Sequence, residues 1–186
     1  LDGLALIKCV KEIRSDVKVI ANDMLMAIRP LHEILLPVNN MQGGTQKQNI
    51  RHINLHLRNE GALIVFPAGE VSRLRPNGIR DGKWQSGFLR MAKANHCPVL
   101  PVYLDAKNSA FFYGVSLLYK PAASALLVKE MFKKKNKNMD ITIGEVIPLD
   151  AFSQLPISLS EQVKLFKKHV YNIAKNKQGV FLTQKP

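Results

Sequence analysis

The stretch Phe66-Pro67-Ala68-Gly69-Glu70-Val71-Ser72-Arg73 joins an apolar run to a loop of polar and charged residues. The apolar run, residues 62–66, predicts a buried β-strand. Gly69 then allows a tight turn or a close approach of the backbone to a ligand, because glycine adopts positive φ angles without strain. A loop that directly follows a buried strand is a common ligand site in α/β folds.

Glu70, Ser72 and Arg73 give this loop a carboxylate, a hydroxyl and a guanidinium. A guanidinium binds phosphate or carboxylate through two parallel hydrogen bonds, so Arg73 is a candidate anion-binding residue. Further positive charge follows at Arg75, Arg80 and Lys83. The alternative is an exposed polar loop in which a Glu–Arg pair has only a structural role.

Apolar periodicity on both sides of the loop predicts strands that alternate with helices. Strands are expected at residues 17–21, 34–38, 62–66, 99–104 and 140–147, and helices at residues 4–13, 23–28, 45–58, 86–95, 114–132 and 160–176. This order implies an α/β fold with a mainly parallel or mixed sheet flanked by helices. We expect one domain over residues 1–186, with ligands near the loops after Phe66 and Leu104.

Local signals predict the element ends and the buried faces. Pro37 places its strand at an edge or an end, because proline cannot donate a ladder hydrogen bond. Thr45 and Ser86 are expected to cap the helices that they precede. The helix residues expected to face the core are Leu4, Ile7, Val10, Ile13, Ile50, Ile53, Leu57, Val163, Phe166, Val170 and Ile173.

The charge of the chain is strongly positive: 27 Lys and Arg residues against 14 Asp and Glu residues give a formal net charge of +13. Such an excess favours an anionic partner, whether nucleic acid, an acidic carrier protein, phosphate groups or anionic lipid. The alternative is a generally basic, solvated surface. Residues 129–137 pose the same choice locally, between contact with an anionic lipid or acidic carrier and a solvated loop.

Cys9 and Cys97 lie far apart in sequence, and neither has a metal-ligating neighbour at the required spacing. We interpret them as reduced core thiols. No apolar run approaches the roughly 18 to 20 residues of a spanning helix, and no signal peptide is visible. The chain opens at Leu1-Asp2-Gly3 without Met, so we expect residues, with room for an anchor, to precede it.

The histidines do not predict a metal site. His52 and His56 have the i, i+4 spacing that can hold a metal, but they lack a Cys or acidic partner nearby in sequence. The other histidines, His32, His96 and His169, are expected to be surface or partly buried residues. Trp84 and Phe88 fit core packing better than contact with an acyl chain.

Four ordered segments together resemble the lysophosphatidate-acyltransferase-like family of glycerolipid synthesis, and especially its bacterial branch often labelled hemolysin. The resemblance extends to about Pro148. The opening Leu1-Asp2-Gly3-Leu4-Ala5-Leu6 is similar to the end of the family's first block, a His followed a few residues later by an Asp. Asp2 matches that acid, whereas the His has no counterpart in this sequence. By itself, an acid at a helix start is usually only a favourable dipole partner.

The remaining blocks match with departures. Residues 34–40 occupy the place of the second block, which contains Asn39 and lacks the family's usual Arg. The third block is commonly Phe-Pro-Glu-Gly-Thr-Arg-Ser, and its matching positions are Phe66, Pro67, Gly69 and Ser72. Its Glu and Arg fall on Ala68 and Val71, although an acid and an Arg occur two places later. The fourth block, a strand containing Pro, corresponds to residues 99–103.

The resemblance implies a glycerol-3-phosphate acyltransferase-like fold and an enzyme that moves a fatty acyl group from acyl carrier protein or acyl-CoA to a lysophospholipid-like or aminolipid hydroxyl. Asp2 would orient the catalytic His, and without that His we expect no activity. Backbone amides near Gly69 would stabilise the oxyanion. The implied acceptor-binding residues are Gly69, Glu70, Ser72, Arg73 and Asn39.

The resemblance also implies partners and a location. We expect no cofactor and no metal, a peripheral location at the cytoplasmic face of the inner membrane, and an anionic membrane surface as a partner. The departures at Ala68 and Val71 make the acceptor the feature that differs most from the family norm, with an amino-acid-containing lipid precursor as one candidate.

Two rival functions come from other classes of protein. A nucleic-acid-binding module is suggested by the net charge, but the chain lacks a recognisable reading helix and a basic segment interleaved with aromatic residues. A non-catalytic lipid-binding or membrane-lytic protein is the other rival, and the sequence has no strongly amphipathic membrane segment to favour it.

Overall fold

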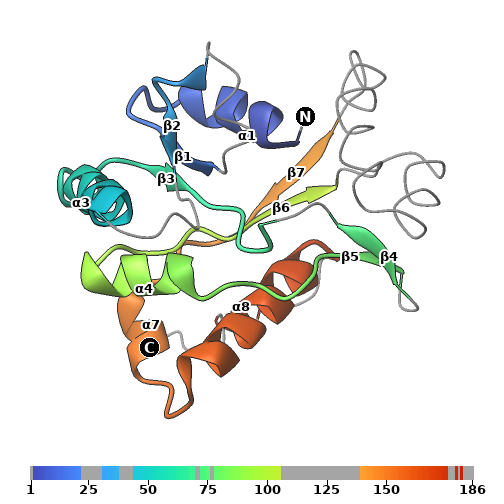
Figure 1. Cartoon of the computed structure of the whole chain (residues 1–186). Helices are drawn as coiled ribbons and strands as arrows, with labels where there is room; N and C mark the ends of the chain where they lie inside the picture. Colours follow the sequence, from blue (N-terminus) through green and yellow to red (C-terminus); the bar gives the residue numbers. More distant parts are fainter. Residues whose placement is uncertain are drawn as a thin grey trace.

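A computed structural model describes residues 2–21, 31–37, 44–69, 72–75, 78–105, 139–175, 179 and 181 (Figure 1). The described helices are α1 (Asp2–Lys11), α3 (Gly44–Arg58), α4 (Gly87–Ala94), α7 (Leu149–Ser153) and α8 (Leu159–Ile173). The described strands are β1 (Lys18–Ala21), β2 (Leu35–Pro37), β3 (Leu63–Ile64), β4 (Arg73–Arg75), β5 (Gly78–Arg80), β6 (Val102–Asp105) and β7 (Asp140–Ile143).

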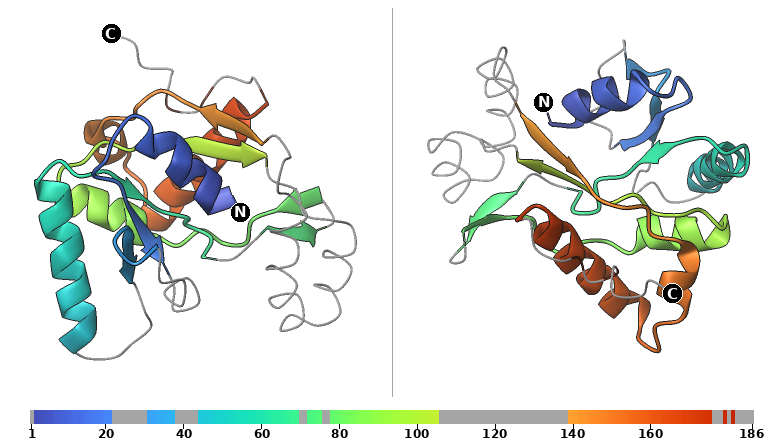
Figure 2. Two further views of the ribbon diagram at one scale, coloured as in Figure 1. Left: turned by 90° about the horizontal axis from the view of Figure 1, so that it is seen from above. Right: turned by 180° about the vertical axis from the view of Figure 1, so that it is seen from behind.

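The described strands form a parallel sheet and two antiparallel pairs. The parallel sheet has the order β2-β1-β3, with Val19 of β1 opposite Leu35 on one side and Ile64 on the other. The pairs β4–β5 and β6–β7 are antiparallel. The α/β prediction is therefore confirmed, with the strands divided among three sheets rather than one. Both views in Figure 2 place α3 and the β4–β5 hairpin at opposite edges of the molecule.

Prolines explain two of the places where the strands are shorter than the sequence predicted. Pro37 ends β2, which is an edge strand as expected. Pro101 interrupts the strand expected at 99–104, because it cannot donate to the ladder. As a result β6 begins at Val102, and Val99 forms only an isolated bridge with Ile147. The strand expected at 62–66 contains no proline and is observed over Leu63–Ile64.

The larger core cluster is aromatic and is centred on Phe166 of α8. Its ring centroid lies 5.9 Å from Trp84, 5.3 Å from Phe88 and 6.0 Å from Phe152. Val163 and Val170, one helical turn to either side, are also buried. The prediction that this face of the last helix points inward is confirmed, and Trp84 and Phe88 pack in the core.

A smaller cluster joins α1 to the parallel sheet through Ile7, Val19 and Leu35. Ile13 was expected on the same face, but this prediction is wrong: α1 ends at Lys11, and Ile13 is 80% exposed. In α3, Ile53 is buried as predicted whereas Ile50 is 47% exposed. Periodicity identified these helices but not how far each was covered by its neighbours.

The helix starts differ from the predicted caps. Thr45 lies inside α3, which already begins at Gly44, so its prediction as a cap is wrong. Ser86 does precede α4, but its side chain makes no capping hydrogen bond. The strongest start is at Ser158, whose hydroxyl accepts from the Glu161 amide while Glu161 accepts from the Ser158 amide, a capping box.

Several predictions fall on residues outside the described part of the chain, namely the helices at 23–28 and 114–132 and the basic segment 129–137. Both cysteines are free thiols as predicted, but both are half-buried rather than in the core. No helix in the described ranges has the length and apolar character of a membrane span.

His169 is fully buried, so the expectation of a surface or partly buried residue is wrong. Its ring stacks on Phe166 and meets Phe181 edge-on. The Phe181 amide donates to Nδ1 over 3.3 Å, which leaves the proton of the neutral ring on Nε2. Within the described residues Nε2 has no hydrogen-bond partner. Burial therefore lowers the pKa of His169.

This burial predicts that the free energy of unfolding falls as the pH is lowered below about 6.5, the ordinary histidine pKa. There the unfolded chain binds a proton that folded His169 resists, so stability declines by at most about 1.4 kcal/mol per pH unit for this one group. Urea unfolding at a series of pH values measures the slope. His169→Leu should flatten it, and His52→Gln on the surface should not; equal slopes in all three proteins would contradict the assignment.

Candidate functional site

The turn that follows β3 is fixed at both ends. The Gly69 amide donates to the Phe66 carbonyl over 3.1 Å, and Gly69 has a φ of 66°. The Gln85 amide donates to the Pro67 carbonyl over 2.8 Å, which ties the turn to the segment before α4. Glycine is favoured here because it adopts a positive φ without strain. Because its amide is already engaged, Gly69 itself does not offer the oxyanion donor that the sequence suggested.

The β4–β5 hairpin comes next and places arginines opposite each other. Its register pairs Arg73 with Arg80 and Arg75 with Gly78. Like charges directly across an antiparallel pair are destabilising. The register therefore places two arginine positions on the same face of the hairpin.

Asp81, the residue after β5, makes hydrogen bonds that connect the hairpin to the segment before α4. One carboxylate oxygen accepts from the Ser72 hydroxyl, and the other accepts from Trp84 Nε1 over 2.9 Å. The Asp81 amide donates to the Tyr171 hydroxyl of α8 over 3.2 Å. The Ser72 hydroxyl, predicted to meet the acceptor, thus has a partner within the loop, and Asp81 was not singled out from the sequence.

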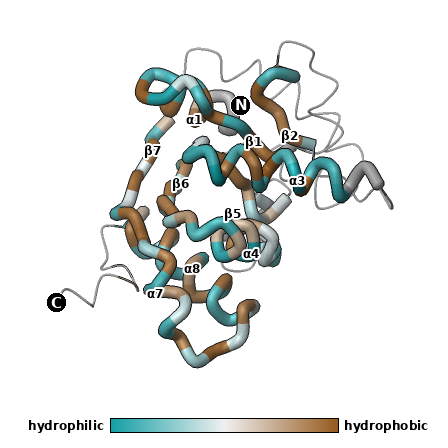
Figure 3. The backbone as a smooth tube through the Cα atoms, turned by 90° about the vertical axis from the view of Figure 1, so that its left-hand side faces the viewer, coloured by the Kyte–Doolittle hydropathy of each residue, from teal (hydrophilic) through white to brown (hydrophobic). Residues whose placement is uncertain are grey.

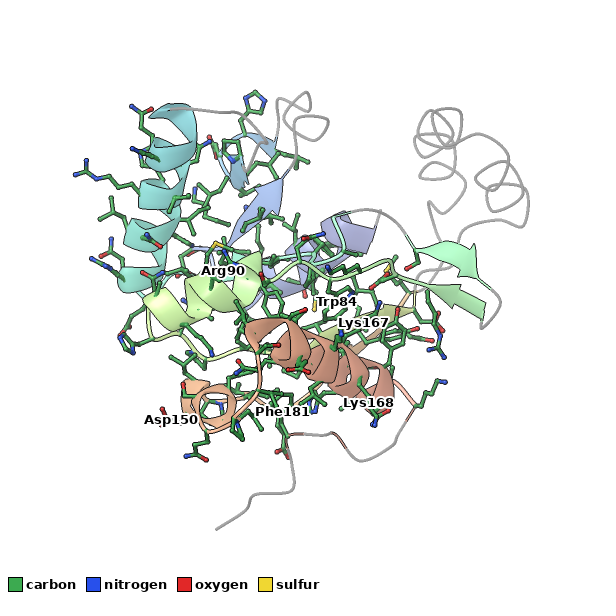
Figure 4. The ribbon with its side chains drawn as sticks, turned by 60° about the horizontal axis from the view of Figure 1, so that its bottom comes forward. Trp84, Arg90, Asp150, Lys167, Lys168 and Phe181 are labelled. Carbon is green, nitrogen blue, oxygen red and sulfur yellow. The ribbon has the colours of Figure 1, made fainter. Side chains whose placement is uncertain are left out.

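Lys167 of α8 holds the same turn from the other side. Its ammonium donates to the Asp81 carbonyl over 3.0 Å and to the Gly82 carbonyl over 2.6 Å. It also lies 5.9 Å from the ring centroids of both Trp84 and Tyr171. Figure 4 shows Lys167 next to Trp84, between α8 and the segment leading into α4.

Tyrosines complete this cluster. The Tyr103 ring meets the Tyr171 ring edge-on at 5.7 Å, and the Arg80 guanidinium carbon lies 5.7 Å from the Tyr171 centroid. Burial raises the pKa of Tyr171, and burial followed by the nearby Asp105 carboxylate raises that of Tyr103. Both phenols are therefore protonated at neutral pH and offer hydroxyl groups and cation-binding ring faces.

The predicted site residues are partly brought together. Gly69, Ser72 and Arg73 form the turn and the start of the hairpin. Asp2 begins α1, and the N-terminal end of that helix lies on the hairpin side of the molecule (Figures 1 and 2). Glu70 and Asn39 fall outside the described residues. Asp81, Lys167 and Tyr171 were missed because their roles depend on contacts between residues about 90 positions apart.

No group of three metal-ligating side chains occurs among the residues with described positions. His56 lies 2.9 Å through Nε2 from the Ala62 carbonyl oxygen. Its ring also occupies the space beside Gly61, where an added Cβ would lie 2.2 Å from Cε1. His56 therefore stabilises the turn that ends α3.

The chain belongs to the acyltransferase family, whose profile matches residues 1–179 and so extends through α8. Two curated relatives are named lyso-glycine lipid O-acyltransferase. The protein from Bacteroides thetaiotaomicron is 32% identical over 80% of this chain, and that from Phocaeicola vulgatus is 29% identical over 82%. The matched regions cover 57% of each relative's own length. No solved structure matches the chain.

Proposed function

We propose that this protein is an O-acyltransferase that acylates a lysolipid with an anionic headgroup, as a lyso-glycine lipid has when its glycine is linked through the amine. The acceptor hydroxyl attacks the thioester carbonyl of acyl carrier protein or acyl-CoA. A C–O bond forms, the C–S bond breaks, the hydroxyl proton passes to a base, and the thiol leaves. Family membership and the names of the two relatives support this reaction class.

The observation that carries the acceptor assignment is the pairing of Arg73 with Arg80 next to the Gly69 turn. A carboxylate between two guanidiniums would accept charge-assisted hydrogen bonds and offset their repulsion. The Asp81 carboxylate accepts hydrogen bonds from Ser72 and Trp84 and so stabilises the turn after β5.

Proton transfer in this proposal depends on the pair that the family motif supplies. In the family motif a His takes the hydroxyl proton; this sequence contains the Asp of that pair, and Asp2 would hold such a His in the required tautomer and orientation. No enzyme nucleophile is needed, because the acceptor attacks directly. The chain needs no metal or organic cofactor for this chemistry.

The surface of α3 supports an anionic membrane as a partner, and we propose that it is the cytoplasmic face of the inner membrane. This 15-residue helix has no acidic residue, and Lys47, Arg51 and Arg58 are exposed on it. None of these three forms an ion pair with a described residue. Ile50 and Leu55 are 47% and 49% exposed beside them, and the coloured part of α3 is mostly hydrophilic in Figure 3. Cations beside apolar side chains suit a headgroup layer.

Replacing Lys47, Arg51 and Arg58 together with Gln is expected to weaken binding to vesicles that contain anionic lipid by about 100-fold, at about 1 kcal/mol for each cation near the surface. Co-sedimentation measures this. The matched control replaces the exposed Lys164, Lys168 and Lys175 with Gln, which removes the same charge elsewhere. Equal losses in both variants would show that net charge, not α3, determines binding.

Acceptor specificity tests the proposal. The full-length protein is given an acyl thioester and either a lyso-glycine lipid or the methyl ester of that lipid, which has lost the carboxylate. We expect kcat/KM to fall at least about 10-fold for the ester, since hydrogen bonds to charged groups contribute about 1.5–3 kcal/mol. Equal rates would exclude carboxylate recognition.

A further inference from the structure

We propose that Lys167 is a positioning residue for the acceptor site: it fixes the turn after β5 and thereby the placement of Arg80 opposite Arg73. The inference rests on the proposed function, because it assigns a role in acceptor binding. Lys167 itself lies on α8, far along the chain from the Phe66–Arg73 segment that marks the site.

The first support is the pair of carbonyls that Lys167 binds. The Asp81 and Gly82 carbonyls directly follow Arg80, and both accept from the one ammonium group. Gly82 is buried, so its carbonyl would have few alternative donors without Lys167. The ammonium therefore restrains the backbone at the point where β5 leaves the hairpin.

The second support is the shared use of Tyr171, one helical turn after Lys167. The Tyr171 ring lies under both the Lys167 ammonium and the Arg80 guanidinium, and its hydroxyl accepts from the Asp81 amide. Arg80 and the turn that follows it thus both contact the same face of α8. A change at Lys167 would reach Arg80 through two routes, the backbone and the tyrosine.

A tryptophan next to Lys167 allows acceptor binding to be measured by fluorescence. Trp84 is the sole tryptophan of the chain. Its ring lies next to the Lys167 ammonium, and its Nε1 donates to Asp81. A headgroup that draws on Arg80 and shifts this turn would change the surroundings of the indole, so intrinsic fluorescence reads acceptor binding without turnover.

Lys167→Met removes the donor while keeping a side chain of similar length. The expected result is an acceptor KM about 10-fold higher with a donor KM within about twofold of wild type, because the change acts on one substrate's site. Half-saturation of Trp84 fluorescence by lyso-glycine lipid, titrated without donor, should shift by the same factor. Lys167→Arg keeps a cation that can donate to both carbonyls, so its acceptor KM is expected to rise less than that of Lys167→Met.

The matched control is Lys168→Met, an exposed cation on the same helix (Figure 4), which should change neither constant. Three outcomes would overturn the inference: an unchanged acceptor KM in an active Lys167→Met protein, equal rises in both KM values, or equal losses in the Met and Arg variants. If the Met variant does not fold, Lys167→Gln replaces it, because an uncharged amide binds the two carbonyls less strongly than the ammonium does; a rise in its acceptor KM no larger than in its donor KM also overturns the inference. Absence of acyl transfer by wild-type protein would instead contradict the proposed function.

Discussion

Asp2→Asn is expected to lower the turnover of the full-length protein by about 10³- to 10⁴-fold, the loss seen when an orienting carboxylate of a catalytic histidine becomes an amide. The amide retains the size of the side chain but no longer fixes the histidine tautomer or stabilises the imidazolium formed in the reaction. Steady-state kinetics at saturating donor and acceptor measure the effect. Both KM values should change little, since Asp2 acts on the transition state.

Asp150→Asn provides the matched control, because Asp150 is also an acid in the first turn of a helix and is exposed. If Asp2 were only a dipole partner of α1, both variants would lose about 0.3–1 kcal/mol of stability and neither would lose turnover. Near-normal rates with Asp2→Asn would remove this residue from the mechanism.

The second large effect is expected at the hairpin. Arg73→Gln should raise the acceptor KM about 10- to 100-fold, through the loss of about 1.5–3 kcal/mol of charge-assisted hydrogen bonding. Arg80→Gln should act in the same direction. The double variant should raise the acceptor KM by less than the product of the two single effects, because both residues bind one headgroup.

Stability separates this role from a structural one. Because Arg73 and Arg80 are opposite each other, removing one charge should leave the free energy of unfolding unchanged or raise it slightly while acceptor binding falls. Arg90→Gln, an exposed change on α4, should alter neither property. Reduced stability with an unchanged acceptor KM would contradict acceptor binding by the hairpin.

The sequence predicted the elements whose signals are local. The inward face of α8 followed from apolar spacing through Phe166, and the edge position of β2 followed from Pro37. The turn at Gly69 was expected from a glycine after an apolar strand, and its positive φ confirms it. These features depend on neighbours within one or two helical turns or on one backbone angle.

Features that depend on distant neighbours were not predicted. Asp81 reads as an ordinary turn residue, and only the folded chain places Tyr171 and Lys167 against it. His169 reads as a polar helix residue until residues 179 and 181 close over it. Ile50 fits an amphipathic face yet is exposed. The apolar periodicity of a helix does not predict how much of its apolar face the neighbouring elements cover.

Nucleic-acid binding is the alternative function that the net positive charge suggests. It predicts salt-dependent DNA binding that involves the exposed cations of α3 and requires neither Asp2 nor the hairpin arginines. DNA binding without any acyl transfer would favour that reading. The family match favours the enzyme.

The most direct test of acyl transfer measures the product of one reaction. The full-length protein is incubated with an acyl thioester and lyso-glycine lipid, the lipids are analysed by mass spectrometry, and released thiol is quantified. We predict a single new acyl ester on the lipid, formed in equal amount to the thiol. Thiol release without an acylated lipid, or no reaction of the folded protein with any lysolipid in a panel, would contradict acyl transfer as its function.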